Sequence, residues 1–169
     1  MISFTAKIDI YDFKKYVYTC VYLPRDVVAK LPLNRHPRLR VNAMVDGHPC
    51  NGALMPDKAG SKQTEHLLKA GYAENEKVWY LQVPKKLLHQ INKQVGDTVT
   101  VGLEIADQDA VVVPPAVRRL LAEDEILRSI WERLTPGKKR SLMHPILTAK
   151  TDSTREKRIL AFADQLAEL

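Results

Sequence analysis

The strongest constraint on the fold is a sequence pattern that occurs twice, with an offset of 60 residues between the copies. The stretch VYLPRDVVAKL begins at Val21, and LQVPKKLLHQI begins at Leu81. Each copy reads as the end of a strand, then a proline, a basic residue and a short amphipathic helix. Proline ends a strand ladder because it lacks an amide proton, and its fixed φ suits the start of a helix. Such a repeat indicates a chain built from related supersecondary units.

The same offset aligns the apolar phase of two later segments. It places Leu39, Val41, Ala43 and Val45 on Val99, Val101, Leu103 and Ile105. A shorter echo, VVVPPAVRRLL, begins at Val111. Two strand–helix–strand halves related by pseudo-symmetry predict a small closed barrel whose mouths are covered by the short helices. The alternative is that two strand–helix pairs align this well by chance.

The hydrophobic periodicity changes near residue 108. Before this point, segments rich in β-branched and aromatic residues favour strands at 2–10, 16–23, 39–45, 77–83 and 98–105. The connection at 51–75 is irregular, with a short helical piece near Glu65–Lys69. From Pro114 onward, apolar residues recur at helical spacing. We therefore predict an α+β protein with a β-barrel domain at residues 1–108 and a short helical tail at residues 109–169.

Capping residues mark the helices of the tail. Thr135 precedes Pro136, which suits the first position of a helix. Ser153 and Glu156 have the spacing of a capping box. Pro145 is expected to stop or kink the helix that begins at Pro136.

The composition narrows the class of protein. With 45% hydrophobic and 27% charged residues, the chain is typical of a globular protein rather than a disordered, collagen-like or membrane-spanning one. The N-terminal stretch lacks the basic and apolar regions of a signal peptide. Its two cysteines, Cys20 and Cys50, are too few for a disulfide framework and are expected to be reduced and buried. We therefore expect a cytoplasmic protein.

Several motifs resemble known bacterial families. The segment VPKKLL…VGDTVTV, from Val83 to Val101, resembles half of the double-split β-barrel of AbrB/MazE-type regulators and antitoxins. The N-terminal unit as a whole is similar to a bacterial domain of unknown function with the same barrel. The tail motifs VVVPPAVRRLLAEDE, IWERLTPGKKR and AK…TRxxRI resemble the bacteriocin-protection family, also called YdeI/OmpD-associated. This resemblance implies a role in tolerance to bacteriocins or envelope stress, and the regulator branch implies DNA binding by dimers.

A basic cluster in the tail is the first candidate site. Its members are Lys150, Arg155 and Arg158, supported by Lys138, Lys139 and Arg140. Arg155 and Arg158 are three residues apart and share a helix face. Because cations near a helix N-terminus oppose its dipole, the functional hypothesis is a site for a phosphate, a carboxylate or an acidic partner. The alternative is intramolecular pairing with Glu132, Glu156 or Asp124.

A second basic cluster lies in the first half of the chain and comprises Arg25, Arg35, Arg38 and Arg40. The net charge of +6 is divided into +4 for residues 1–60, −1 for residues 61–110 and +3 for residues 111–169. A homodimer could join such patches into a surface that contacts phosphates. The alternative is a solvated charged face. Tyr16, Tyr18 and Tyr22 have strand spacing and are expected to pack on one face of the barrel.

No metal-ligand spacing, nucleophile elbow or phosphate-binding glycine pattern is present in the sequence. We therefore expect no metal, no cofactor and no enzymatic activity. The primary hypothesis is a non-enzymatic protein of the bacteriocin-protection type that binds an anionic ligand or acidic partner through the tail. The alternative is a DNA-binding regulator that acts as a barrel dimer.

Overall fold

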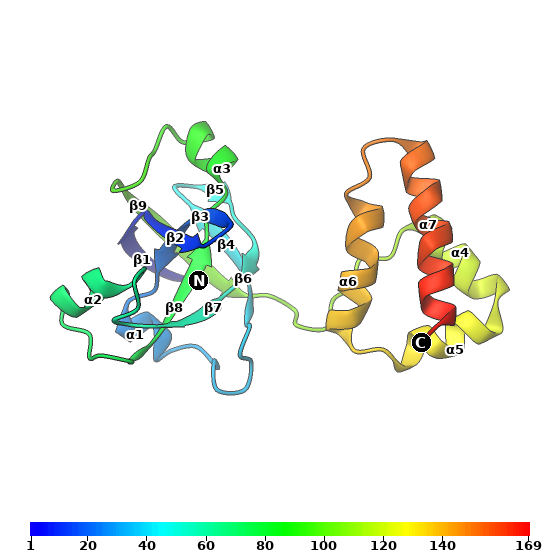
Figure 1. Ribbon diagram of the computed structural model, residues 1–169, viewed down its shortest axis with the longest axis horizontal. Coiled ribbons are helices and arrows are strands. Elements are labelled where there is room, and N and C mark those ends of the chain that lie inside the picture. The colour runs from blue at the N-terminus through cyan, green and yellow to red at the C-terminus, as the bar shows by residue number, and fades with distance from the viewer. The chain divides into compact units, whose positions relative to one another are not determined.

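The computed structural model describes the backbone of residues 1–169 and every side chain except that of Phe13. The chain forms two compact units, a β unit at Met1–Asp107 and a helical unit at Gln108–Leu169 (Figure 1). The strands are β1 Ile2–Lys7, β2 Asp9–Phe13, β3 Tyr16–Tyr22, β4 Arg40–Val45, β5 His48–Pro49, β6 Gly52–Ala53, β7 Met55–Lys58, β8 Lys77–Gln82 and β9 Thr98–Ile105. The helices are α1 Arg25–Val28, α2 Glu65–Lys69, α3 Lys85–Gln90, α4 Pro115–Glu123, α5 Glu125–Arg133, α6 Pro136–Leu147 and α7 Asp152–Ala167.

The β unit consists of antiparallel sheets, as the α+β prediction requires. One sheet has the order β1-β9-β4-β5, with β6 also paired to β4, and the other has the order β2-β3-β8-β7. The predicted closed barrel is not observed among the described strand pairings. The expected single strand at 2–10 is divided at Ile8, whose amide donates to the Asp97 carbonyl at 2.9 Å. Because Ile8 is anchored there, β1 joins one sheet and β2 joins the other.

The repeated segments form the same local structure. Pro24 and Pro84 occupy the N-cap positions of α1 and α3, each with extended backbone. The strands aligned by the repeat, β4 and β9, lie side by side, with Ala43 opposite Leu103. Their apolar residues enter the core of the β unit, except that Ile105 is 51% exposed. The apolar alternation of the sequence is therefore correct for β9 except at its last residue.

The helices of the helical unit surround a second core, in which the ring of Trp131 meets that of Phe162 edge to face at 5.7 Å. Side chains of Asp124, Thr135 and Thr151 accept the capping hydrogen bonds of α5, α6 and α7. The predicted capping box at Ser153 is wrong, because α7 begins at Asp152, two residues earlier than a Ser153 cap predicts, and is capped by Thr151. Pro145 lies inside α6, which ends two residues later at Leu147. No helix in the described chain is long and apolar enough to cross a membrane.

Candidate anion-binding site in the helical unit

Arg155 and Arg158, from the predicted tail cluster, are engaged within the helical unit. Arg155 forms an ion pair with Asp152 at 2.6 Å and donates to the Ala149 carbonyl at 3.2 Å. Arg158 donates to the Pro145 carbonyl near the end of α6. Both arginines therefore fasten the first turns of α7 to the C-terminal end of α6. These partners are not the residues expected for intramolecular pairing, which were Glu132, Glu156 and Asp124.

The other members of the tail cluster divide into anchored and exposed residues. Arg140 donates to the carbonyls of Gln108 and Ala110 at 2.8 and 3.2 Å, which holds the segment before α4 against α6. The ammonium group of Lys139 lies 5.6 Å from the centre of the Trp131 ring and bonds the Glu132 carbonyl at 3.4 Å. Lys138 and Lys150 are exposed. The structure does not bring all six residues together around one pocket, and anion binding by this cluster remains a prediction.

The basic residues of the β unit are also divided. Arg25 pairs with Glu76 at 2.7 Å, stacks over Tyr72 at 4.3 Å and bonds the Gly71 carbonyl. The hydrogen bond from Arg25, aided by that from the Ala73 amide, lowers the pKa of Glu76 to about 2. Arg40 donates to the Asp107 carbonyl at 3.0 Å. Arg35 and Arg38 are exposed in the loop before β4, and nucleic-acid contact by these four residues remains a prediction.

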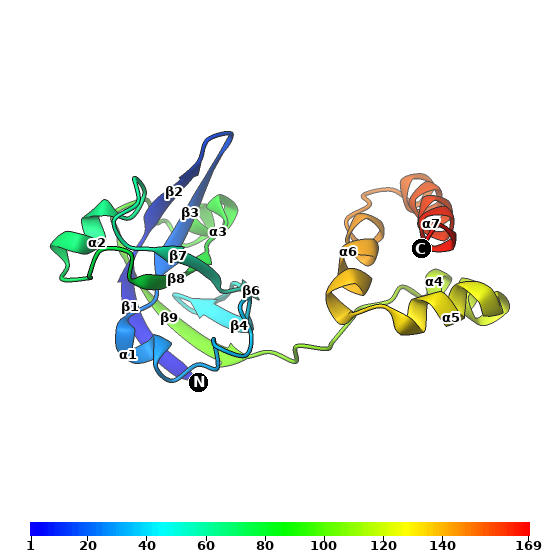
Figure 2. The same ribbon diagram turned by 60° about the horizontal axis from the view of Figure 1, so that its bottom comes forward.

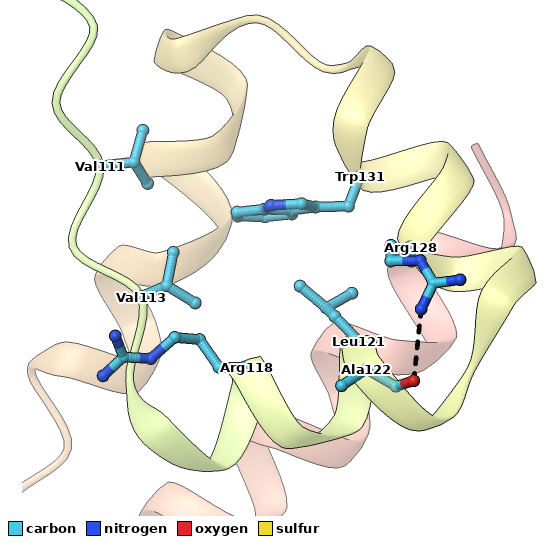
Figure 3. A pocket seen from close by; sticks show the side chains of 7 residues that line it. All are labelled: Val111, Val113, Arg118, Leu121, Ala122, Arg128 and Trp131. Carbon is cyan, nitrogen blue, oxygen red and sulfur yellow. Dashed lines mark hydrogen bonds between the residues drawn. The ribbon is translucent and has the colours of Figure 1, made fainter.

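A hollow of about 470 Å³ lies between the segment before α4 and the helices α4 and α5. Its lining is Val111, Val113, Arg118, Leu121, Ala122, Arg128 and Trp131. Figure 3 shows the indole of Trp131 along one side and Leu121 projecting toward it from α4. The guanidinium groups of Arg118 and Arg128 lie at opposite ends of the hollow (Figure 3). A volume of this size falls in the usual range for small-molecule sites, roughly 300–1,000 Å³.

The two arginines of the hollow differ in their engagement. The side chain of Arg118 is exposed, and its guanidinium is without a hydrogen-bond or ion-pair partner among the described residues. Arg128 is half-buried and donates a single long hydrogen bond, 3.3 Å, to the Ala122 carbonyl at the end of α4. Most guanidinium donors at this hollow therefore remain available to an anion, and the side chains between the two arginines are apolar. This combination suits a molecule that carries both an anionic group and an apolar part.

Sequence reasoning does not find the residues of this hollow as a site. In the sequence, Trp131 belongs to the apolar stripe of its helix, and it does pack against Phe162 in the core. Arg118 lies in the VVVPPAVRRLL echo, and Arg128 lies ten residues later on another helix. No local spacing links them, because only the packing of α4 against α5 places both beside the same hollow.

The two cysteines are buried, and burial keeps their thiols in the protonated form. Burial raises the pKa of the Cys20 thiol to about 12, with smaller contributions from Asp9 and Asp57. Burial also raises the pKa of Cys50, to about 11. Both thiols therefore stay protonated at neutral pH, and a thiol is a weak nucleophile compared with a thiolate. Among the described residues, no group of three or more His, Cys, Asp or Glu is arranged to hold a metal ion.

Comparison with known families assigns both units. Residues 4–103 match the family described as domain of unknown function DUF1905. This match covers more than half of the chain, and the chain belongs to that family. Residues 110–168 match the family described as bacteriocin-protection, YdeI or OmpD-associated. The expected resemblance of the tail is thus confirmed, whereas the relation to AbrB/MazE-type regulators is not. No curated protein matches the chain.

Proposed function

We propose that the chain is a non-enzymatic binding protein of the bacteriocin-protection type, whose helical unit takes up an anionic molecule with an apolar part. The observation that carries this proposal is the hollow with Arg118 and Arg128 at its ends and Trp131 along its side. The anionic group of the ligand pairs with a guanidinium, and its apolar part lies against the indole and the valines. The anion-binding role expected for the tail is thereby assigned to α4 and α5 rather than to α7.

Energetics favour this location over the predicted tail cluster. A ligand at Arg155 or Arg158 must displace hydrogen bonds that these residues already make within the protein. At the hollow, Arg118 loses only water, and Arg128 exchanges one long hydrogen bond. A hydrogen bond to a charged group contributes about 1.5–3 kcal/mol. Apolar contact adds roughly 25 cal/mol for each Å² removed from water.

A direct test uses 8-anilinonaphthalene-1-sulfonate, which combines a sulfonate with an aromatic body. Its binding to the folded full-length chain is followed by titration calorimetry and by dye fluorescence. Because Arg118 and Arg128 lie at opposite ends of the hollow, the single sulfonate pairs with only one of them. At least one of the variants Arg118→Ala and Arg128→Ala is therefore expected to weaken binding about tenfold or more, because it removes that charged hydrogen bond. Arg119→Ala is the matched control, since it removes an equal charge from an exposed position on the same helix.

Two further measurements sharpen this test. The neutral analogue N-phenyl-1-naphthylamine lacks the sulfonate. It is therefore expected to bind the wild-type and variant proteins with the same affinity. Equal weakening by Arg119→Ala would show that only the overall charge matters and would contradict a defined site. Absence of saturable binding by the wild-type chain would also contradict it.

A further inference from the structure

The hairpin formed by β2 and β3 projects beyond the rest of the β unit (Figure 2). Its turn is Lys14-Lys15, between the paired residues Phe13 and Tyr16. Large apolar side chains near this turn are unusually accessible: Tyr16 is 59% exposed, Val17 48% and Tyr18 37%. The expectation that these tyrosines pack against a barrel is therefore wrong for the outer part of β3, because that part of the strand extends past its neighbours.

The backbone conformation of the turn is unfavourable for lysine. Lys14 adopts a φ of 50°, in the left-handed region that glycine and asparagine occupy most easily. A two-residue hairpin turn with a positive φ at its first position favours glycine there for this reason. Two adjacent lysines at this position also repel each other. The lysine pair is thus not explained by the stability of the hairpin.

The tyrosines form a row on one face of the sheet. Tyr16 and Tyr18 alternate along β3, and their rings lie nearly parallel, with centroids 6.2 Å apart and planes inclined by 26°. Tyr18 is paired across the hairpin with Tyr11, whose ring stacks on Tyr80 at 4.8 Å. The row therefore runs from the exposed tip toward the body of the unit.

The acidic residues of the hairpin do not oppose an anionic partner on this face. Asp12 pairs with Val17 and so lies on the opposite face from Tyr16 and Tyr18. Asp9 lies on the tyrosine face but bonds the ring of His66 at 2.6 Å. The side-chain amide of Gln63 donates to the Asp12 carbonyl at 2.6 Å, which ties the hairpin to the segment before α2. These contacts hold the tyrosine row in place beside the two lysines.

We propose that this hairpin binds single-stranded nucleic acid. Bases stack on the accessible rings of Tyr16 and Tyr18, and the neighbouring phosphates pair with Lys14 and Lys15. Aromatic platforms next to cationic groups are the general means by which proteins hold single strands without reading sequence. A membrane is the less favourable partner, because the lysines stand at the extreme tip and would enter the hydrocarbon first during insertion.

The test measures fluorescence anisotropy of a fluorescein-labelled oligo(dT) probe and an oligo(U) probe with the full-length chain at several salt concentrations. Lys14→Gly/Lys15→Ser removes both charges and places glycine at the turn position with a positive φ, so the hairpin stays folded. We expect this variant to bind about tenfold or more weakly and to reduce the salt slope by about 1.4, at roughly 0.7 for each phosphate that is no longer neutralised. Lys85→Ala/Lys86→Ala, an adjacent lysine pair on α3, is the matched control and is expected to change neither.

Stacking is tested separately. Tyr16→Ala and Tyr18→Ala are each expected to weaken binding at least about fivefold with the salt slope unchanged. Val17→Thr, on the opposite face, is the control and is expected to bind as the wild type does. Arg118→Ala in the helical unit is expected to leave oligonucleotide binding unchanged, so this proposal and the one for the hollow fail independently.

Three results would overturn the proposal. The first is no binding of either oligonucleotide at low salt. The second is an equal loss of affinity in the α3 lysine variant. The third is binding to vesicles of phosphatidylglycerol and phosphatidylcholine that requires Lys14, Lys15 and Tyr16, while oligonucleotide binding does not require them.

Discussion

Replacing Arg158 by alanine tests whether the basic residues of α7 are structural. Near the end of α6, the amide of Thr148 donates to the His144 carbonyl, and the amide of Ala149 donates to the Ile146 carbonyl. The intervening Pro145 carbonyl instead accepts from Arg158, with a longer bond of 3.3 Å from the Thr148 hydroxyl. Arg158 thus satisfies one of the carbonyl groups that every helix leaves open at its C-terminus.

The structure sets the size of the expected effect. A hydrogen bond from a charged donor contributes about 1.5–3 kcal/mol, and water replaces part of it at this half-buried site, which leaves about 1–2 kcal/mol for Arg158→Ala. For a unit of this size, each kcal/mol lowers the melting temperature by about 4–8 °C. The helical unit of the variant is therefore expected to melt roughly 5–15 °C lower than that of the wild type.

The assay follows thermal unfolding of the full-length chain by circular dichroism at 222 nm. Trp131 fluorescence in a Trp79→Phe background reports the helical unit, because Trp79 belongs to the core of the β unit. Lys157→Ala, an exposed neighbour on α7, is the control. If Arg158→Ala melts together with this control, the arginine is not needed to complete α6, and the anion site predicted for the tail regains its basis.

Three further predictions concern other parts of the chain. In β9, Leu103→Ala is expected to lower the free energy of unfolding, measured with urea, by about 2–5 kcal/mol. Ile105→Ala, at an exposed position, is expected to lower it by less than about 1 kcal/mol. Similar losses in the two variants would contradict the observation that Leu103 is buried and Ile105 is exposed. Asp124→Ala removes the side-chain cap of α5 and is expected to cost about 1 kcal/mol, measured in the same way, and an unchanged urea midpoint would refute the cap. The pKa of Glu76 is lowered to about 2 in the folded protein, so its stabilising effect is present above the unfolded pKa and is lost as the pH falls from about 5 toward 2. Wild-type stability is therefore expected to fall toward that of Glu76→Gln over this pH range, and a constant difference between the two would refute the assignment.

Local sequence is informative wherever neighbouring residues decide the outcome. Proline, followed by a basic residue and an apolar pair, predicts the start of α3, and Thr135 is recognisable as a cap. The division of the first strand at Ile8 is not predictable in this way, because it depends on hydrogen bonds to the turn at Gly96 and Asp97, far along the chain. The hollow is not predictable from local sequence either, because its two arginines line the same hollow only when α4 packs against α5. The tail cluster is the opposite case. Its spacing of basic residues is typical of a binding motif, but in the structure Arg155 and Arg158 mainly form hydrogen bonds that join α7 to the end of α6.

The pairing of the two repeated strands has a consequence for how the β unit folds. β9 lies between β1 and β4, and Ile2 is opposite Leu103. The first strand of the chain therefore has no partner in its sheet until the ribosome has released the last strand of the unit. Contacts between residues so distant in sequence slow folding, because a long loop must close before they form. Until β9 is synthesised, β1 has no partner in this sheet, and β4 is paired only with β5 and β6. β9 completes the sheet when it pairs with both β1 and β4.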